Sequence, residues 1–139
     1  MTLRRCAPTA LVAALMLACA PPGPRRIEIP MFSDSFAYLV SWAPQPAVAR
    51  EPVLFRVVVR DKKTKAPIEN GEGRIFATSA DGISTHDSFV AAQEVGTYTA
   101  RLKFITAGDW AVGVQFRKDS TSRLERPEDL RLSVHNERQ

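Results

Sequence analysis

The feature that most constrains the fold is a two-residue alternation of apolar and polar side chains late in the chain. In residues 97–104 the apolar positions are Tyr98, Ala100, Leu102 and Phe104. In residues 110–117 they are Trp110, Val112, Val114 and Phe116. A period of two places successive side chains on opposite faces of a strand, so each segment predicts a β-strand with one buried face. Because only the turn 107–109 separates them, we expect the two strands to pair as a hairpin.

The same period governs most of the chain beyond Asp34. It predicts further strands over 36–42, 53–60, 74–79, 88–92 and 130–134. Glycine, proline and polar residues occupy the gaps, and we expect 83–87 to be an irregular loop and 119–129 a polar connection. About seven short strands without a helical period predict an all-β fold, an immunoglobulin-like antiparallel β-sandwich.

The first residues of the chain have the pattern of an export signal. Arg4 and Arg5 precede an apolar run over 10–18 that ends at Cys19. A positively charged start followed by about ten apolar residues is typical of a secretory signal peptide, whereas a membrane span needs roughly twenty. We therefore expect residues 1–18 to be a signal helix that directs the chain out of the cytoplasm.

Cys19 refines this prediction. The sequence Met16-Leu17-Ala18-Cys19 resembles the lipobox of bacterial lipoproteins, and the resemblance implies cleavage before Cys19 and lipidation of its thiol. The alternative is an ordinary signal peptide cleaved after Ala20. Since Cys6 lies inside the signal, Cys19 would be the sole cysteine of the exported chain and could form no internal disulfide. We expect a lipid anchor in the bacterial cell envelope, with the protein facing the periplasm or the exterior.

The remaining 121 residues suffice for one domain with its own core. Residues 19–34 contain four prolines and predict an extended tether, followed by a domain over 35–135 and a tail over 136–139. Loss of Arg4 and Arg5 with the signal leaves 17 basic and 15 acidic residues. This small excess of positive charge does not predict nucleic-acid binding.

Three segments carry a family resemblance. They are the strand 53–60, the sequence Lys65-Ala66-Pro67-Ile68, and the pair Gly96-Thr97-Tyr98 and Gly108-Asp109-Trp110. Together they make the region 53–116 similar to the YtkA-like domain family, related to the FixH-like proteins. The resemblance implies an exported or membrane-tethered immunoglobulin-like domain, and in some members a role in copper handling through methionines and a histidine in the middle loop. This chain departs from that pattern, because Met31, the only methionine after the signal, lies in the predicted tether.

The candidate metal ligand is His86, with Asp81 and Asp87 near it in the sequence. Soft Cu(I) requires thioether or thiolate ligands, and none is near His86, so we expect no metal or other cofactor and an exposed loop histidine. His135 is a still poorer candidate. The neighbouring Ser84, His86, Asp87 and Ser88 do not predict a catalytic group, because successive side chains along a strand point apart.

These observations predict no catalytic residues and no enzyme. We expect a non-catalytic binding or accessory module, held at the membrane through its N-terminal lipid and contacting another protein of the cell envelope. The alternative is an extracytoplasmic metal-binding protein related to copper.

Overall fold

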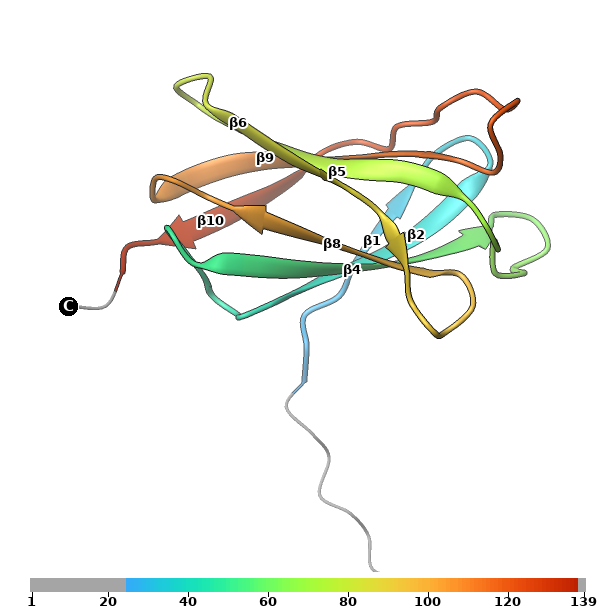
Figure 1. Ribbon diagram of the computed structural model, residues 1–139, viewed down its shortest axis with the longest axis horizontal. Coiled ribbons are helices and arrows are strands. Elements are labelled where there is room, and N and C mark those ends of the chain that lie inside the picture. Colours follow the sequence, from blue (N-terminus) through green and yellow to red (C-terminus); the bar gives the residue numbers. More distant parts are fainter. Residues whose placement is uncertain (1–24, 138–139) are drawn as a thin grey trace, which may run out of the picture.

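The computed structural model describes residues 25–137 and has an all-β architecture of two five-stranded sheets packed face to face (Figure 1). Sheet A contains, in spatial order, β1 (Ile29–Phe32), β2 (Phe36–Ala43), β4 (Pro52–Asp61), β8 (Thr97–Lys103) and β7 (Val90–Ala91). Sheet B contains β3 (Ala47–Val48), β10 (Leu130–His135), β9 (Gly108–Arg117), β5 (Glu72–Ser79) and β6 (Ser84–Ser88). Neighbouring strands are antiparallel except β3 and β10. Within residues 25–137 no helix is long and apolar enough to cross a bilayer.

The core lies between the two sheets and follows the predicted alternation. The inward rows of β4 and β9 are all buried and comprise Val53, Phe55, Val57, Val59, Trp110, Val112, Val114 and Phe116. At one end of the core the Phe116 ring packs edge-on against Phe36 and Tyr98, with both ring centroids 5.2 Å away. Edge-to-face packing adds to the burial of these large apolar surfaces. The predicted β-sandwich is therefore confirmed as an all-β, two-sheet fold.

The predicted hairpin of β8 and β9 is wrong. β8 pairs with β4 and β7 in sheet A, whereas β9 pairs with β10 and β5 in sheet B. Residues 104–107 carry the chain from one sheet to the other, and Phe104 meets Trp110 across the interior at 5.1 Å between ring centroids. Two strands with inward apolar side chains can pair within one sheet, or they can belong to the two facing sheets and pack across the core. The alternation of apolar residues is the same in both cases, so it does not predict which one occurs.

The structure has ten strands in residues 25–137 where the sequence predicted about seven. The additional strands are β1, β3 and β6, and the predicted strand 88–92 is reduced to β7. β6 occupies the predicted loop 83–87 and consists of Ser, Thr, His, Asp and Ser. As an edge strand it buries neither face fully, so it lacks the apolar alternation that would have identified it.

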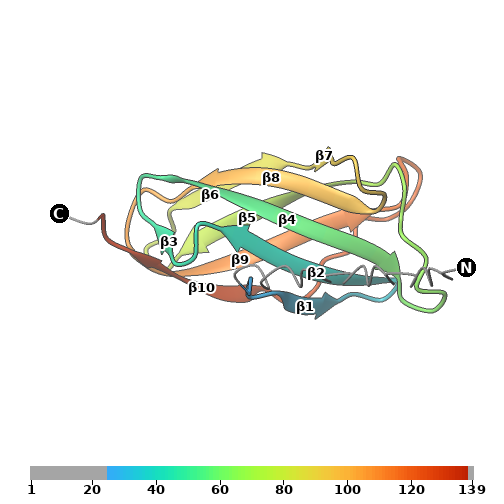
Figure 2. The same ribbon diagram turned by 90° about the horizontal axis from the view of Figure 1, so that it is seen from below.

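The sandwich begins inside the segment predicted to be a tether. β1 (Ile29–Phe32) pairs with β2 from Ile29 opposite Val40 to Phe32 opposite Ala37, and Met31 is buried in the core. Residues 25–28 project from sheet A on the side away from sheet B, as Figures 1 and 2 both show. The predicted signal helix and Cys19 lie outside the described residues.

Candidate functional site

The most distinctive surface feature is centred on Phe76 of β5, on the outer face of sheet B. Its register neighbours are Gly113 on β9 and His86 on β6. A Cβ atom at Gly113 would lie 2.3 Å from Cζ of Phe76. The ring therefore lies directly against the backbone of β9, and only glycine at position 113 leaves room for it.

Two guanidinium groups contact this ring. Cζ of Arg126 lies 4.6 Å from the ring centroid, and Cζ of Arg74 lies 5.7 Å from it. Both distances fall within the range of cation–π attraction. Arg74 comes from β5 itself, and Arg126 from the connection between β9 and β10. We call Arg74, Phe76 and Arg126 the Phe76 cluster.

The two arginines differ in their partners. Nη2 of Arg126 donates to both carboxylate oxygens of Asp129, at 3.0 and 2.9 Å. Nε of Arg74 donates to the neutral amide oxygen of Gln115 at 2.8 Å, and Arg74 forms no salt bridge within residues 25–137. Arg74 is also exposed. Its positive charge is therefore available to an approaching anion, whereas that of Arg126 is shared with Asp129.

The connection that supplies Arg126 is fixed at Glu125. The backbone of Glu125 exchanges two hydrogen bonds with Phe116, of 2.9 and 2.8 Å. Its carboxylate accepts from Oγ of Ser33 at 2.9 Å and from the amide of Ser35 at 2.8 Å. Burial acts to raise the pKa of Glu125, but the hydrogen bonds from Ser35 and Ser33 outweigh it and lower the pKa below its ordinary value. Arg126 thus starts from a fixed backbone position.

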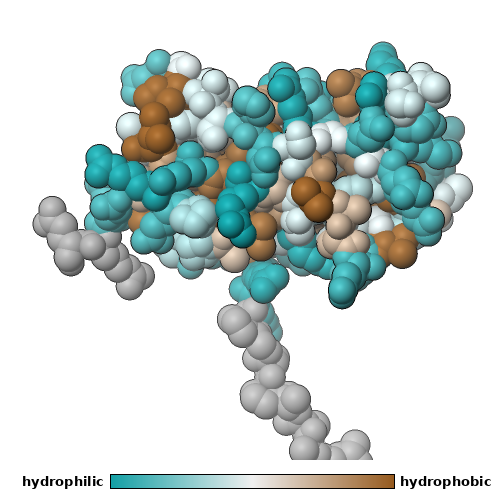
Figure 3. Space-filling model, viewed as in Figure 1, coloured by the Kyte–Doolittle hydropathy of each residue, from teal (hydrophilic) through white to brown (hydrophobic). Residues whose placement is uncertain are grey.

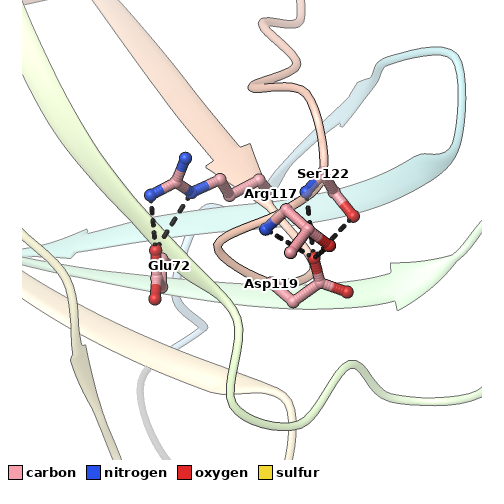
Figure 4. Close-up of polar contacts among 5 residues, drawn as sticks. Glu72, Arg117, Asp119 and Ser122 are labelled. Atoms are coloured by element: carbon pink, nitrogen blue, oxygen red, sulfur yellow. Dashed lines mark hydrogen bonds and ion pairs between the residues drawn. The ribbon is translucent and has the colours of Figure 1, made fainter.

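The beginning of the same connection is also held, as Figure 4 shows. Oδ1 of Asp119 accepts hydrogen bonds from the amides and hydroxyls of Thr121 and Ser122. These bonds, the hydroxyl of Thr121 first, lower the pKa of Asp119 to about 2. Nearby, Nε and Nη2 of Arg117 donate to Oε2 of Glu72 at 3.0 and 2.8 Å, which joins β9 to β5. Hydrogen bonds within this connection and between β9 and β5 therefore hold the backbone near the Phe76 cluster in place.

His86 lies beside this cluster, exposed on the edge strand β6. Ser84 and Ser88 share its face because they are two residues away in either direction. Asp87 lies on the opposite face, where its carboxylate accepts from the amides of Arg101 at 2.8 Å and Ser88 at 3.0 Å. The expectation that adjacent side chains diverge is met for His86 and Asp87, which do not form one site. It does not hold for Ser84 and Ser88, which lie on the same face as His86.

The other predicted positions lie apart from His86. Asp81 is exposed in the turn between β5 and β6, and His135 ends β10, which is separated from β6 by β9 and β5. Residues 25–137 contain no group of three His, Cys, Asp or Glu side chains close enough to hold a metal ion. The metal-binding alternative stays a prediction, as does the lipidation of Cys19, which is outside the described range.

The sandwich also has a hollow of about 750 Å³ at the end where β10 finishes. Among its lining residues are Arg50, Ile105 and Glu137. Arg50 is the single basic residue of the lining and Glu137 the single acidic one within the described residues. None of the predicted site residues lines this hollow. Because its one basic and one acidic residue offset each other, the hollow has no excess of either charge.

Sequence reasoning did not identify the Phe76 cluster. The alternation of β9 does place Gly113 on the outer face, but its pairing with Phe76 follows only from the register between β5 and β9. The position of Arg126 follows from contacts of Glu125 with residues some ninety positions earlier in the chain. An outward glycine on a strand is the one signal that could have suggested an aromatic ring lying over it.

No protein-family model matches the chain, and no curated protein matches it either. The similarity to the YtkA-like family therefore stays a prediction based on the sequence segments described above.

Proposed function

We propose that this protein is an exported, lipid-anchored module of the bacterial cell envelope that binds a partner protein through the Phe76 cluster and catalyses no reaction. The observation that carries the proposal is the cluster itself, a half-buried aromatic ring contacted by two arginines on the outer face of a sheet. Aromatic and arginine side chains are enriched among the residues that dominate binding energy at protein interfaces.

The surroundings of the cluster suggest the chemistry of the partner. Arg74 has no carboxylate partner in the described residues, and Arg131 is exposed on the same face of sheet B. The outward residues of β9 beside Phe76 are the small Ala111 and Gly113. No large side chain of β9 therefore covers the ring from this side. We infer that the partner presents carboxylates to Arg74 and an apolar side chain to the ring.

The location in this proposal rests on the first nineteen residues of the sequence. The charged start, the apolar run and Cys19 support export and anchoring, and the two-sheet architecture agrees with an immunoglobulin-like domain of YtkA-like type. A mass measurement of the mature N-terminus tests the anchor separately from the binding surface. We expect acylated Cys19, and a free N-terminus at Ala20 or later would contradict it.

The binding surface is tested by site-specific crosslinking in intact cells. A photoreactive residue replaces Thr78 in the otherwise unchanged full chain. Thr78 is exposed on the outer face of sheet B, two residues beyond Phe76 on the same strand. We expect one discrete crosslinked product that disappears with Arg74→Gln and weakens with Gly113→Ala. The control is Lys63→Gln, which removes one positive charge from the exposed turn after β4. Monomer alone, or a product equally sensitive to Lys63→Gln, would refute the assignment of this surface.

A further inference from the structure

The outer face of sheet A has an unusual charge distribution. Among the outward positions of its five strands none is Asp or Glu, whereas four are basic: Arg56, Arg60, Arg101 and Lys103. The outer face of sheet B differs, because Glu72 and Asp109 occupy outward positions there among the basic ones. The two faces of the sandwich therefore offer different chemistry.

Most of the positive charge on sheet A is not neutralised within residues 25–137. Arg56 forms an ion pair with Glu94 of the loop before β8, and Glu94 is itself 70 % exposed. Arg60 donates only to the backbone oxygen of Lys65, at 3.5 Å. Arg101 and Lys103 are exposed and form no salt bridge in the described part of the chain.

Apolar side chains alternate with basic ones along β4 on this face, in the order Leu54, Arg56, Val58 and Arg60. Leu39 lies opposite Val58, and Leu54, which is 43 % exposed, lies opposite Arg101. Apolar side chains placed between long basic ones suit the headgroup region of a membrane, where the charges meet phosphates and the apolar groups meet the acyl boundary.

The chain also leaves the domain on this side. Residues 25–28 project from sheet A away from sheet B (Figure 1), and Figure 2, which views sheet A from outside, shows them beside β1 and β2. The backbone of Ile27 is held by two hydrogen bonds of 3.2 Å with the side chain of Gln45. Only residues 20–24 separate Arg25 from Cys19. Fully extended, such a link reaches roughly 20 Å.

We propose that the outer face of sheet A lies on the anionic phospholipid headgroups of the membrane that holds Cys19. The inference rests on the proposed lipid anchor, because the short link keeps this face close to the bilayer. Each basic residue near an anionic membrane surface strengthens binding by about fivefold. The outer face of sheet B, with the Phe76 cluster, then points away from the membrane towards a partner.

The test uses the full chain with its native N-terminus, reconstituted into vesicles of phosphatidylcholine alone or with phosphatidylglycerol added. A fluorophore is attached at Leu54→Cys on sheet A or at Ser133→Cys on sheet B, and nitroxides on the lipid headgroups quench it by proximity. We expect stronger quenching at position 54 than at 133, and only when phosphatidylglycerol is present. Flotation of the same vesicles reports whether the chain is anchored.

Charge-removing variants link this quenching to the basic face. Arg101→Gln with Lys103→Gln should lower the preference for the membrane-facing orientation about 30-fold. The matched pair Arg74→Gln with Arg131→Gln removes the same charge from sheet B and should leave quenching at position 54 unchanged. Equal quenching at both positions, or quenching that ignores phosphatidylglycerol, overturns the proposal. Failure to float with neutral vesicles overturns the anchor instead.

Discussion

Replacement of Tyr98 by phenylalanine tests how the connection between the two sheets is stabilised. The Tyr98 hydroxyl donates to the backbone oxygen of Ile68 at 2.6 Å and accepts from the amide of Gly71 at 2.9 Å. Residues 68–71 carry the chain from β4 in sheet A to β5 in sheet B. One hydroxyl therefore satisfies two backbone groups at this crossing.

The substitution removes the hydroxyl and leaves the ring, whose centroid stays 5.2 Å from that of Phe116. Leaving a buried backbone group without its partner costs about 1–3 kcal/mol. Because Ile68 is buried and the Gly71 contact is partly buried, we expect Tyr98→Phe to lower the free energy of unfolding by about 3 kcal/mol. The midpoint of thermal unfolding should then fall by roughly 10 °C.

Tyr38→Phe is the matched control. Within residues 25–137 the Tyr38 hydroxyl has one hydrogen-bond partner, Oγ of Ser33 at 3.1 Å. Ser33 already donates to Glu125, so Tyr38 is the donor. Its removal leaves no backbone group unpaired and should cost about 1 kcal/mol. Urea unfolding of both variants measures the difference. Equal losses for the two substitutions would show that the crossing at 68–71 does not depend on Tyr98.

Three further predictions follow from buried or crowded positions. Oγ1 of Thr97 is buried and has no hydrogen-bond partner within residues 25–137, so Thr97→Val should raise the free energy of unfolding by about 1 kcal/mol; a loss in urea unfolding would contradict this. Gly73→Ala would place Cβ 2.1 Å from the backbone oxygen of Gln115, and we expect a loss of about 3 kcal/mol or more, or no folded protein, as judged by circular dichroism. Burial raises the pKa of Tyr38 from 10 to about 12, so the unfolded chain releases this proton first. The associated stability is complete below pH 10 and declines up to pH 12, and ultraviolet titration should show a late ionisation that is absent in Tyr38→Phe.

The inward faces of the long strands were predictable from the sequence, and their pairing was not. Residues 53–59 and 110–116 each contain four apolar residues at every second position, and burial of one face is the only packing that suits such a row. Which strands pair is determined by contacts between residues that are far apart in the sequence. The hairpin prediction failed for this reason, because the short 104–107 connection crosses between sheets instead of turning within one.

The candidate site was less accessible to sequence reasoning than the fold. His86 was correctly expected to be exposed, although it lies on a strand rather than in a loop. The significance of Phe76 depends on a glycine on another strand and on Arg126 from a distant connection. Neither relation appears in any local pattern, since both arise only when the strands are in register.

The crossing of the chain between β8 and β9 has a consequence for the order of folding. All five strands of sheet A lie within residues 29–103, whereas sheet B needs β9 and β10 from the last part of the chain. In a chain synthesised from its N-terminus, all strands of sheet A are available before β9 and β10, so its apolar inner face still lacks the part of its cover that these two strands provide. Pairings between distant segments also form slowly, typically in milliseconds to seconds. The interval before residues 108–135 become available is therefore when the protein is most exposed to aggregation and proteolysis.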